Sequence, residues 1–350
     1  YLYKYEHEKA LDYFGRSLAI FEELGDKSGM GLSLRNMGVV HRNKGDYDKA
    51  LDYYGRSLAI QEELGDKSEM GLTLHTIGIV QLYKGDLDAA LDYHGRSLAI
   101  REEIGDKHGI GYSLYKIGIV HHDKGDLDTA LDYYGRSLAI RESIGNKRGM
   151  GYSLFSIGLI HHEKGDYDKA LDYFERSLVI KEELGNKRGM GKYLLNIGNV
   201  HYNKGDYDKA LNYYDRSLSI LEERGNKYGM GYSLHNIGLV YFYKGDYKKA
   251  EESLEKSLAI KKEIGLKAFE TTTYLYLTYK HLGKDYDVKE IHTLIKAAEN
   301  IEFEVHYQLF KLLENKSYLE FAYKQIQAKA SEMEEEFKAK FLSYPIPKAI

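Results

Sequence analysis

The chain has 350 residues, of which 30% are charged, and its formal net charge is −4. This balance of charge argues against recognition of nucleic acid or an anionic membrane through bulk electrostatics. Because the chain contains no cysteine, disulfide bonds and thiolate metal sites are excluded. No apolar run approaches the roughly 20 residues that cross a bilayer, and no signal peptide is recognisable, so we expect a soluble, cytoplasmic protein.

A block of forty residues recurs along the chain in one register. It reads DYDKALDYYGRSLAI from Asp46 and DLDTALDYYGRSLAI from Asp126, and a drifted copy begins at Asp246. A repeat of this length is typical of a solenoid, in which each repeat buries its apolar face against its neighbours. Since the chain begins in the middle of a repeat, we expect a fragment that lacks one helix at its start.

Each complete repeat predicts two helices, A and B, joined by tight turns. In the repeat at 67–106, Leu74 and Ile77 fall at helical spacing, and Gly85 and Asp86 then interrupt the pattern before a second helical stretch. The glycine suits a left-handed position after a helix, and the aspartate suits an N-cap. Turns this short make the two helices antiparallel. In the first complete repeat we expect helix A near 28–43 and helix B near 47–64.

Helix A carries an interior glycine in each complete repeat, although glycine there costs about 1 kcal/mol relative to alanine. This recurrence predicts a close approach of helix B, and we expect the small alanines of helix B to be the partners. The glycines are Gly38, Gly78, Gly118, Gly158, Gly198 and Gly238, and the alanines are Ala50, Ala90, Ala130, Ala170 and Ala210.

The repeat resembles the tetratricopeptide signature W-x2-L-G-x2-Y…A-x3-F…P. Leu74-x2-Ile77-Gly78-x2-Gln81 and Ala90-x3-His94 carry the resemblance, which covers roughly residues 1–283. Leucine replaces the tryptophan, the closing proline is absent and six residues are added. This longer form is similar to the repeats of kinesin light chains, spindle-orientation adaptors and prokaryotic signalling proteins, which implies a groove that binds peptides.

We therefore expect an all-α protein, a right-handed α-solenoid of antiparallel helix pairs. The array should occupy residues 1–266, with a partial repeat at 1–26 and six full repeats at 27–266. Residues 267–350 should form degenerate repeat-like helices and a cap over the end of the stack. The predicted helices there span residues 269–282, 288–301, 305–314 and 318 to about 342, and Pro345 and Pro347 should end the last helix.

Positions that differ between repeats predict the binding surface. They lie on one face of helix A, and in the family that the chain resembles this face lines the concave groove. A face that varies in tyrosine, histidine and arginine has the composition of a binding hot spot, although such residues could also simply cover the inner wall. The candidate peptide-binding residues are Arg35, Asn36, Arg42, His75, Tyr115, His122, Phe155, His162, Asn196, Tyr202, His235 and Asn236.

Three of these residues, Asn36, Asn196 and Asn236, stand two positions before the helix-A glycine. In similar arrays, an asparagine in this slot holds the backbone of an extended peptide, and a carboxamide can donate and accept at once. Thr76, Lys116 and Ser156 interrupt the series, so a local contact on the helix surface is an equal alternative.

The sequence favours neither a metal site nor catalysis. The adjacent histidines at 121–122 and 161–162 point in different directions on a helix, which makes chelation difficult. Gly65-Asp66-Lys67-Ser68 lacks the G-x-x-x-x-G-K-[ST] pattern of a phosphate loop. We therefore predict no enzyme activity, no cofactor, no metal, and no nucleic-acid or membrane partner.

The preferred function is a scaffold or sensor that takes a peptide or a partner helix in the concave groove. One alternative is a module that self-associates through the ends of the stack, giving a homo-oligomer. Another is a regulatory segment of a larger signalling enzyme. The weak resemblance of the C-terminal segment to the ends of prokaryotic signalling arrays is the reason for this third interpretation.

Overall fold

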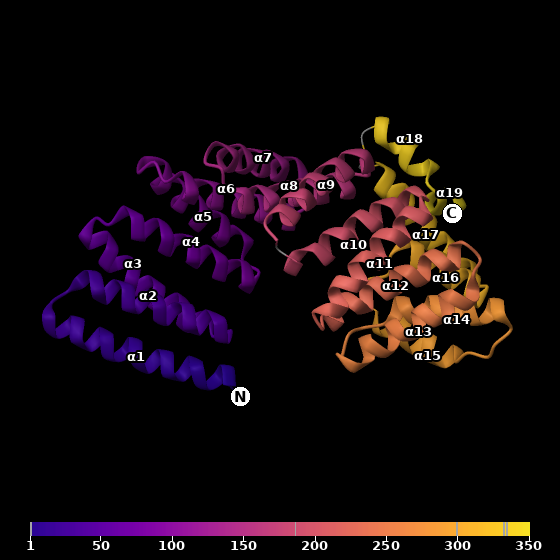
Figure 1. Ribbon diagram of the computed structural model, residues 1–350, viewed down its shortest axis with the longest axis horizontal. Helices are drawn as coiled ribbons and strands as arrows, with labels where there is room; N and C mark the ends of the chain where they lie inside the picture. The colour runs from indigo at the N-terminus through magenta and orange to yellow at the C-terminus, as the bar shows by residue number, and fades with distance from the viewer. Residues whose placement is uncertain (1, 186, 299, 332, 334) are drawn as a thin grey trace. The chain divides into compact units, whose positions relative to one another are not determined.

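The computed structural model describes residues 2–185, 187–298, 300–331, 333 and 335–350. All regular elements of these residues are helices, which confirms the all-α prediction (Figure 1). The chain divides into two compact units, Tyr1–Ser153 and Leu154–Ile350. The handedness of the solenoid and the boundary at residue 266 stay predictions.

The first compact unit starts with a lone helix B and continues as alternating helices A and B. Its helices are α1 (Leu2–Leu24), α2 (Lys27–Lys44), α3 (Tyr47–Leu64), α4 (Lys67–Lys84), α5 (Leu87–Glu103), α6 (Lys107–Asp123), α7 (Leu127–Ser143) and the start of α8 (Lys147–Glu163). In the first complete repeat, helix A is thus one residue longer at each end than predicted, and helix B has the predicted bounds.

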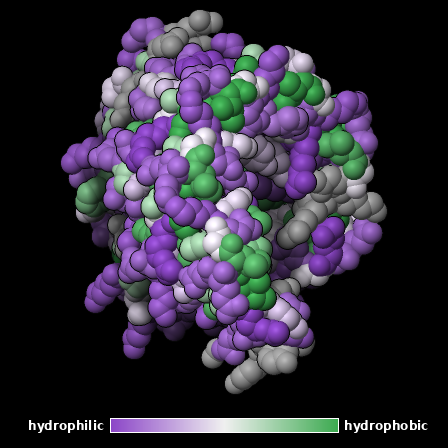
Figure 2. Space-filling view, turned by 90° about the vertical axis from the view of Figure 1, so that its left-hand side faces the viewer, coloured by the Kyte–Doolittle hydropathy of each residue, from purple (hydrophilic) through white to green (hydrophobic). Residues whose placement is uncertain are grey.

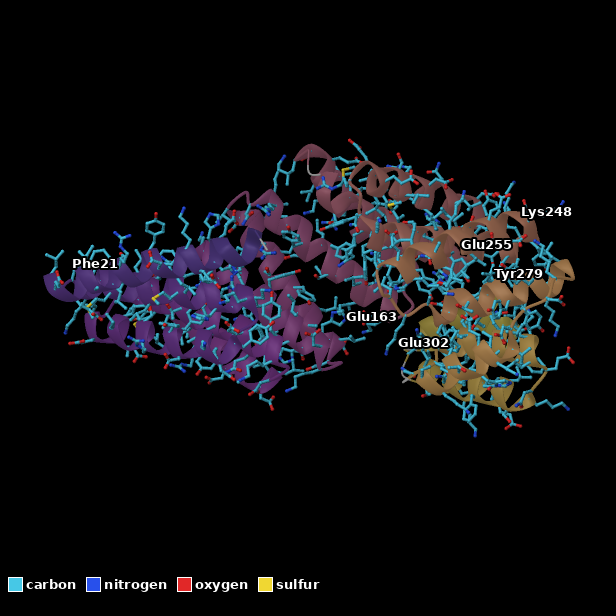
Figure 3. All side chains as sticks on the ribbon, turned by 90° about the horizontal axis from the view of Figure 1, so that it is seen from below. Phe21, Glu163, Lys248, Glu255, Tyr279 and Glu302 are labelled. Carbon is cyan, nitrogen blue, oxygen red and sulfur yellow. The ribbon has the colours of Figure 1, made fainter. Side chains whose placement is uncertain are left out.

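The second compact unit continues the alternation and then departs from it after α14. Its helices after α8 are α9 (Tyr167–Glu183), α10 (Lys187–Lys204), α11 (Tyr207–Glu223), α12 (Lys227–Tyr243), α13 (Tyr247–Glu263), α14 (Phe269–Leu282), α15 (Val288–Ala297), α16 (Phe303–Leu313), α17 (Lys316–Ser331), α18 (Glu335–Ser343) and α19 (Pro345–Ala349). Tyr279 of α14 donates to Glu255 of α13 at 2.7 Å, and Figure 3 shows the two side chains together.

The turns between helices follow the predicted glycine–aspartate pattern. Gly85 has φ of 80°, the left-handed conformation that glycine adopts without a steric penalty. Asp86 then accepts a hydrogen bond from the backbone N–H of Ala89 at 3.1 Å, which caps α5. The predicted punctuation of the repeat is therefore confirmed.

The helix-A glycines approach helix B closely, but the predicted partner was wrong. A Cβ added to Gly118 would lie 2.7 Å from the ring of Tyr134, and one added to Gly158 would lie 2.7 Å from the ring of Phe174. These bulky residues stand four positions after the helix-B alanine. The glycine thus makes room for the ring of helix B, while Ala130 is fully buried beside it.

The C-terminal helices differ from the prediction in three main ways. Helix α15 ends at Ala297 instead of continuing to residue 301. The single helix expected from residue 318 to about 342 is divided into α17 and α18. Pro345 starts the short helix α19 instead of ending a helix, because the first position of a helix needs no backbone N–H.

Helices α17–α19 lie against the repeats instead of only covering the end of the stack. Ile326, Phe341 and Tyr344 share one apolar core with Tyr167 and Phe174 of α9. The rings of Tyr167 and Tyr344 are 4.7 Å apart between centroids. The C-terminal helices therefore cover part of the surface that the repeats would otherwise expose.

Candidate functional site

Exposed apolar side chains form a row across the successive A helices of the first compact unit. Leu32, Leu72 and Tyr112 occupy the same position in consecutive repeats, and they are 45%, 39% and 51% exposed. Figure 2 shows apolar side chains interrupting the hydrophilic surface on the side that it presents. Large apolar residues in a repeated register form a surface that a partner can bury.

Arginine side chains of α2 accompany this row. The Arg35 guanidinium pairs with Glu69 of α4 at 2.6 Å, and its side chain is only 13% exposed. Arg42 donates to Asn43 at 3.2 Å.

Two further candidates of the first compact unit are half-buried. Asn36 lies on α2, and His122 lies at the end of α6.

His75 is buried instead of lining an open groove. It is 7% exposed, and its ring centroid lies 5.1 Å from that of His94 and 5.9 Å from that of Tyr112. Burial is the main cause that holds the pKa of His75 well below its ordinary value, and the neighbouring His94 and Arg101 add to it. His75 is therefore a neutral side chain behind the surface.

Tyr115 is half-buried and packs on helix B. Its ring centroid lies 5.5 Å from that of Tyr134, and the Arg141 guanidinium carbon lies 4.8 Å from the Tyr115 ring centroid. Tyr115, which we predicted to bind a peptide, therefore contributes to the packing of helices A and B.

Phe155, in the second compact unit, is also part of the packed interior. It is 6% exposed, and its ring centroid lies 5.2 Å from that of Phe174 and 4.3 Å from that of Tyr193. The Lys192 ammonium lies 5.1 Å from the Phe155 ring centroid. A substitution of Phe155 would thus change stability as well as any binding.

The asparagines of the second compact unit make contacts within the protein. Asn196 donates to the backbone carbonyl of Lys192 at 2.8 Å, which is the local helix contact considered above. Asn236 donates to Asn199 at 2.8 Å, and Asn199 also accepts from the hydroxyl of Tyr214 at 2.9 Å. Their predicted role in holding a peptide backbone stays a prediction.

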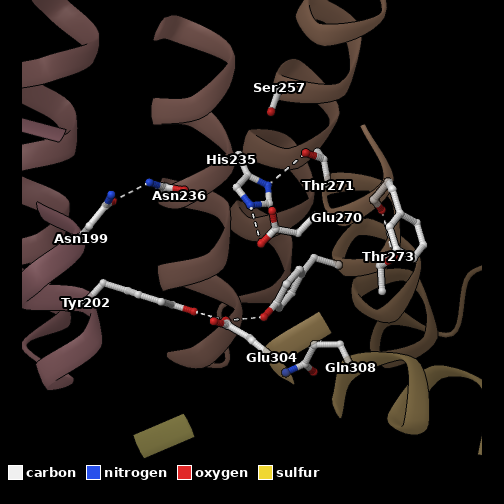
Figure 4. A network of polar contacts seen from close by, with 12 residues as sticks. Asn199, Tyr202, His235, Asn236, Ser257, Glu270, Thr271, Thr273, Glu304 and Gln308 are labelled. Atoms are coloured by element: carbon white, nitrogen blue, oxygen red, sulfur yellow. Dashed lines mark hydrogen bonds and ion pairs between the residues drawn. The ribbon is translucent and has the colours of Figure 1, made fainter. Parts of the chain in front are cut away.

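Tyr202 binds a carboxylate from the C-terminal region. Its hydroxyl donates to Glu304 of α16 at 2.6 Å (Figure 4). Tyr274 and Tyr243 donate to the same oxygen at 2.5 Å and 3.3 Å. Burial raises the pKa of Glu304, although the tyrosine hydrogen bonds oppose it. Gln308 completes this network by donating to Tyr243 at 2.8 Å.

His235 lies in a second buried polar network. Its Nδ1 lies 3.0 Å from the Thr271 hydroxyl, and its Nε2 lies 3.4 Å from Glu270 (Figure 4). Lys261 donates to Thr271 at 2.8 Å, and burial lowers the pKa of Lys261 to about 8. The arrangement of Thr271, His235 and Glu270 resembles the nucleophile, base and acid of a hydrolase triad. Because Thr271 is fully buried, no substrate reaches it in this arrangement.

His162 lies near the C-terminal helices. Its Nε2 is 2.9 Å from the amide nitrogen of Asn203, and burial lowers the pKa of His162 to about 4, with a smaller contribution from Lys329. Nearby, Lys340 of α18 pairs with Asp168. The candidates His162 and Tyr202 therefore lie close to the chain's own C-terminal helices.

A cavity of about 470 Å³ opens between the ends of α14, α15 and α16. Phe269, Leu294 and Val305 line it together with Glu270 and Glu302. Within the described ranges, no three histidine, cysteine, aspartate or glutamate side chains come together as metal ligands. None of the described helices combines the length and apolar composition needed to cross a bilayer.

Buried cations of helix B were missed in the sequence. Arg101, Arg141, Lys181 and Lys261 recur at one position and are almost fully buried. The signal that could have revealed them is the column of this position, which reads Gln61, Arg101, Arg141, Lys181, Leu221 and Lys261. A cation that recurs within an apolar helix face indicates a polar contact inside the stack.

The sequence matches the family model described as tetratricopeptide repeat, over residues 1–63, 29–103, 109–183 and 190–263. These matches cover more than half of the chain. It belongs to the tetratricopeptide repeat family. A search of curated proteins finds no match for this tetratricopeptide repeat chain.

Three solved structures share the fold at low sequence identity. A signal-transduction ATPase with a tetratricopeptide repeat sensor from Pyrococcus horikoshii has a TM-score of 0.66 and 17% identity, over 89% of this chain and 48% of that chain. The apo form of RapI has a TM-score of 0.61 and 18% identity, over 77% and 99%. BtubC from P. vanneervenii has a TM-score of 0.58 and 19% identity, over 63% and 92%.

Proposed function

We propose that this tetratricopeptide repeat array is a non-catalytic scaffold or sensor that binds a peptide or a partner helix on its helix-A face. The observation that carries the proposal is the row of Leu32, Leu72 and Tyr112, each at least 39% exposed at the same repeat position. Proteins of this family generally bind other proteins, which supports the same function.

The accessible part of the binding surface is the helix-A face of residues 27–153. In the second compact unit, Phe155, Tyr202 and His235 are buried, so they contribute mainly to packing and offer little surface to a partner. The aromatic and leucine side chains of the first unit supply contact area, and the half-buried Asn36 offers a donor and an acceptor for a peptide backbone.

The experiment is calorimetric titration of a partner recovered with the whole chain. Replacing Leu72 and Tyr112 with serine should weaken the affinity about tenfold or more, because both side chains lose their buried contact area. The matched control is Val179→Ser on α9, a helix B, where Val179 is 51% exposed. Loss of affinity in the control with full affinity in the double variant would refute this assignment.

Self-association is a second candidate with an observation of its own. Association at the first end of the stack would bury Ile20 and Leu24 on α1, provided that no further helix precedes α1 in the full protein. Sedimentation of the chain and of the variant Ile20→Glu over a concentration series tests this candidate. A monomer at every concentration would exclude association through α1.

A regulatory segment of a larger signalling protein is the third candidate. The Pyrococcus horikoshii protein combines a repeat sensor with an ATPase, and this chain aligns with 48% of it. The similarity concerns the fold, so this candidate depends on the gene sequence on both sides of the chain. A contiguous ATPase, kinase or cyclase domain there would support it, and a stop codon on both sides would exclude it.

A further inference from the structure

Two cavities of the second compact unit meet at three shared residues. The larger one, of about 470 Å³, lies at the ends of α14, α15 and α16. The smaller one, of about 190 Å³, is lined from α9, α10, α16 and the C-terminal helices. Glu270, Glu302 and Val305 line both cavities. A cavity of several hundred cubic ångströms with a few polar groups on its wall is the usual form of a small-molecule site.

The wall of the larger cavity is mainly apolar. Phe269, Leu294 and Ile301 line it together with the exposed Ala297. Lys267 also lines it, but Lys267 already makes an interaction within the chain. The charges that this cavity offers to a ligand are therefore mainly those of the two shared glutamates.

Glu270 is a fixed carboxylate that solvent still reaches. His235 lies 3.4 Å from one of its oxygens (Figure 4), while 47% of the Glu270 side chain is exposed. Burial raises the pKa of Glu270, but His235 and Lys261 together hold this pKa below its ordinary value. Glu302 is exposed at the start of α16. Both carboxylates are thus charged groups that a ligand can approach.

The smaller cavity combines aromatic rings with a hydroxyl that lacks a partner. Tyr344 is 8% exposed, and its hydroxyl has no hydrogen-bond partner among the described residues. The Lys329 ammonium lies 5.9 Å from the Phe303 ring centroid and 5.7 Å from that of Phe341. Aromatic faces attract ammonium groups, and these rings already face one. A buried hydroxyl without a partner indicates a polar group from outside the chain.

The charge along the two cavities favours a cation. Glu304 lines the smaller cavity in addition to Glu270 and Glu302, whereas the Lys329 ammonium faces the phenylalanine rings. Throughout the described part of the chain, no three acids or histidines come together as metal ligands. The cation that suits this site is therefore an organic ammonium and not a metal ion.

We propose that these cavities bind a small organic amine with an apolar body. The ammonium lies between Glu270 and Glu302, and the apolar body contacts Phe269, Leu294 and Val305 in the larger cavity. We call the surface formed by these five residues the amine site. The bound amine links α14–α16 to the C-terminal helices around the smaller cavity. This inference does not depend on the helix-A face of the first compact unit.

Calorimetric titration of the whole chain with phenethylamine tests the proposal. Phenethyl alcohol is the matched ligand, because it has the same apolar body without the charge. The amine should bind about tenfold or more tighter than the alcohol, since it gains hydrogen bonds to charged groups. Phenylalanine adds a carboxylate to the amine and should bind more weakly, because the site already has more carboxylates than cations. Hydrogen exchange should become slower at the ends of α14, α15 and α16 when the amine binds.

Four variants locate the site. Glu270→Gln keeps an acceptor for His235 and should remove most of the preference for the amine over the alcohol. Glu302→Gln should do the same from an exposed position whose side chain caps no helix. Ala297→Trp fills the larger cavity and should weaken the amine and the alcohol alike. Glu252→Gln, on the exposed surface of α13, is the matched control and should bind as the wild-type chain does.

Equal affinity for phenethylamine and phenethyl alcohol would overturn the proposal, as would wild-type affinity in both Glu270→Gln and Glu302→Gln. If Glu270→Gln fails to fold, Glu302→Gln decides the result alone. Tighter binding of phenylalanine than of phenethylamine would contradict the assignment to a simple amine. A short acetylated peptide with one lysine that binds more tightly than phenethylamine would instead make the site one for a protein side chain, and would also overturn the assignment.

Discussion

The Tyr202 hydroxyl donates a hydrogen bond to the Glu304 carboxylate at 2.6 Å, although 102 positions of sequence separate the two residues. Through this contact, a helix outside the forty-residue pattern becomes part of the repeat array. Tyr243 and Tyr274 donate to the same oxygen, so hydroxyls from α10, α12 and α14 converge on one buried acid. The contact also explains why Tyr202, a predicted binding residue, is directed into the protein.

Replacing Glu304 with alanine should destabilise the second compact unit. The change removes the common acceptor of three tyrosine hydroxyls, and a buried polar group left without a partner costs about 1–3 kcal/mol. We expect the free energy of unfolding in urea to fall by more than about 2 kcal/mol. Tyr202→Phe is the control, because it removes one donor and should cost only about 1 kcal/mol. Equal losses in the two variants would contradict the role of Glu304 as the shared acceptor.

Replacing Gly118 with leucine should destabilise the stack severely. A Cβ at this position would already lie 2.7 Å from the Tyr134 ring. Overpacking of a core typically costs about 1–3 kcal/mol, and we expect more here because neighbouring repeats prevent the helices from separating. Urea denaturation followed by circular dichroism measures the loss.

The surface variant Lys84→Ala is the control for this prediction. Lys84 pairs with Asp48 at 2.7 Å, but the two side chains are 38% and 91% exposed. Such a pair contributes little, so the variant should lose under about 0.5 kcal/mol. Similar denaturation midpoints for Gly118→Leu and Lys84→Ala would show that the glycine is not needed for the close approach.

The buried pair of His75 and His94 should make the first compact unit sensitive to acid. His94 is fully buried, and neither of its ring nitrogens has a partner among the described side chains. Burial lowers the pKa of His94 to about 3, with contributions from Lys116 of α6 and Arg101 of α5. Burial also lowers the pKa of His75, and Arg42 of α2 adds to this shift.

The sign of the effect follows from proton uptake. An unfolded histidine has a pKa of about 6.5, so the unfolded chain gains protons below this pH while the folded pair stays neutral. The free energy of unfolding has its full value above about pH 6.5. It should fall by about 1.4 kcal/mol per pH unit for each histidine as the pH decreases towards the pKa of that histidine in the folded chain.

The variant His94→Tyr tests this prediction. The same repeat position holds Tyr54 and Tyr134 in the neighbouring repeats, so a tyrosine fits this position without a titrating imidazole. Between pH 6.5 and 5 it should lose about 2 kcal/mol less stability than the wild-type chain, since one buried histidine is removed. Urea midpoints at several pH values give the comparison. The same acid sensitivity in both proteins would assign the effect to other groups.

Replacing Phe341 with alanine should loosen the C-terminal helices. Phe341 is 1% exposed and shares an apolar core with Tyr167, Phe174 and Tyr344. Loss of a buried phenylalanine costs about 3–5 kcal/mol. Hydrogen exchange should become faster in α17–α19, whereas α2–α5 should be unchanged. Faster exchange in α2–α5 alone would contradict the position of Phe341 in this core.

The repeated helix pairs could be predicted because each repeat carries the same local sequence signals for its turns. Gly85 and Asp86 mark a turn by their own conformational preferences, and the forty-residue period repeats that signal along the chain. Residues such as Tyr115 were harder to place. Their spacing gives the helix face, but whether a ring contacts solvent or helix B depends on the size of Tyr134 opposite it.

The contacts of the C-terminal region could not be predicted from spacing. Glu304 and Phe341 lie outside the period, so no pattern relates them to Tyr202 or Tyr167. The buried cations of helix B, such as Arg141, could be found only by comparing repeats, because their signal is one repeat position and not a local motif.

Hydrogen–deuterium exchange of the whole chain, with and without its recovered partner, tests the central claim most directly. Binding on the helix-A face predicts slower exchange in α2, α4 and α6, which carry Leu32, Leu72 and Tyr112, and little change in α3, α5 and α7. Slower exchange confined to α3, α5 and α7, or to α1, would contradict the helix-A surface and favour association through the outer face or the end of the stack.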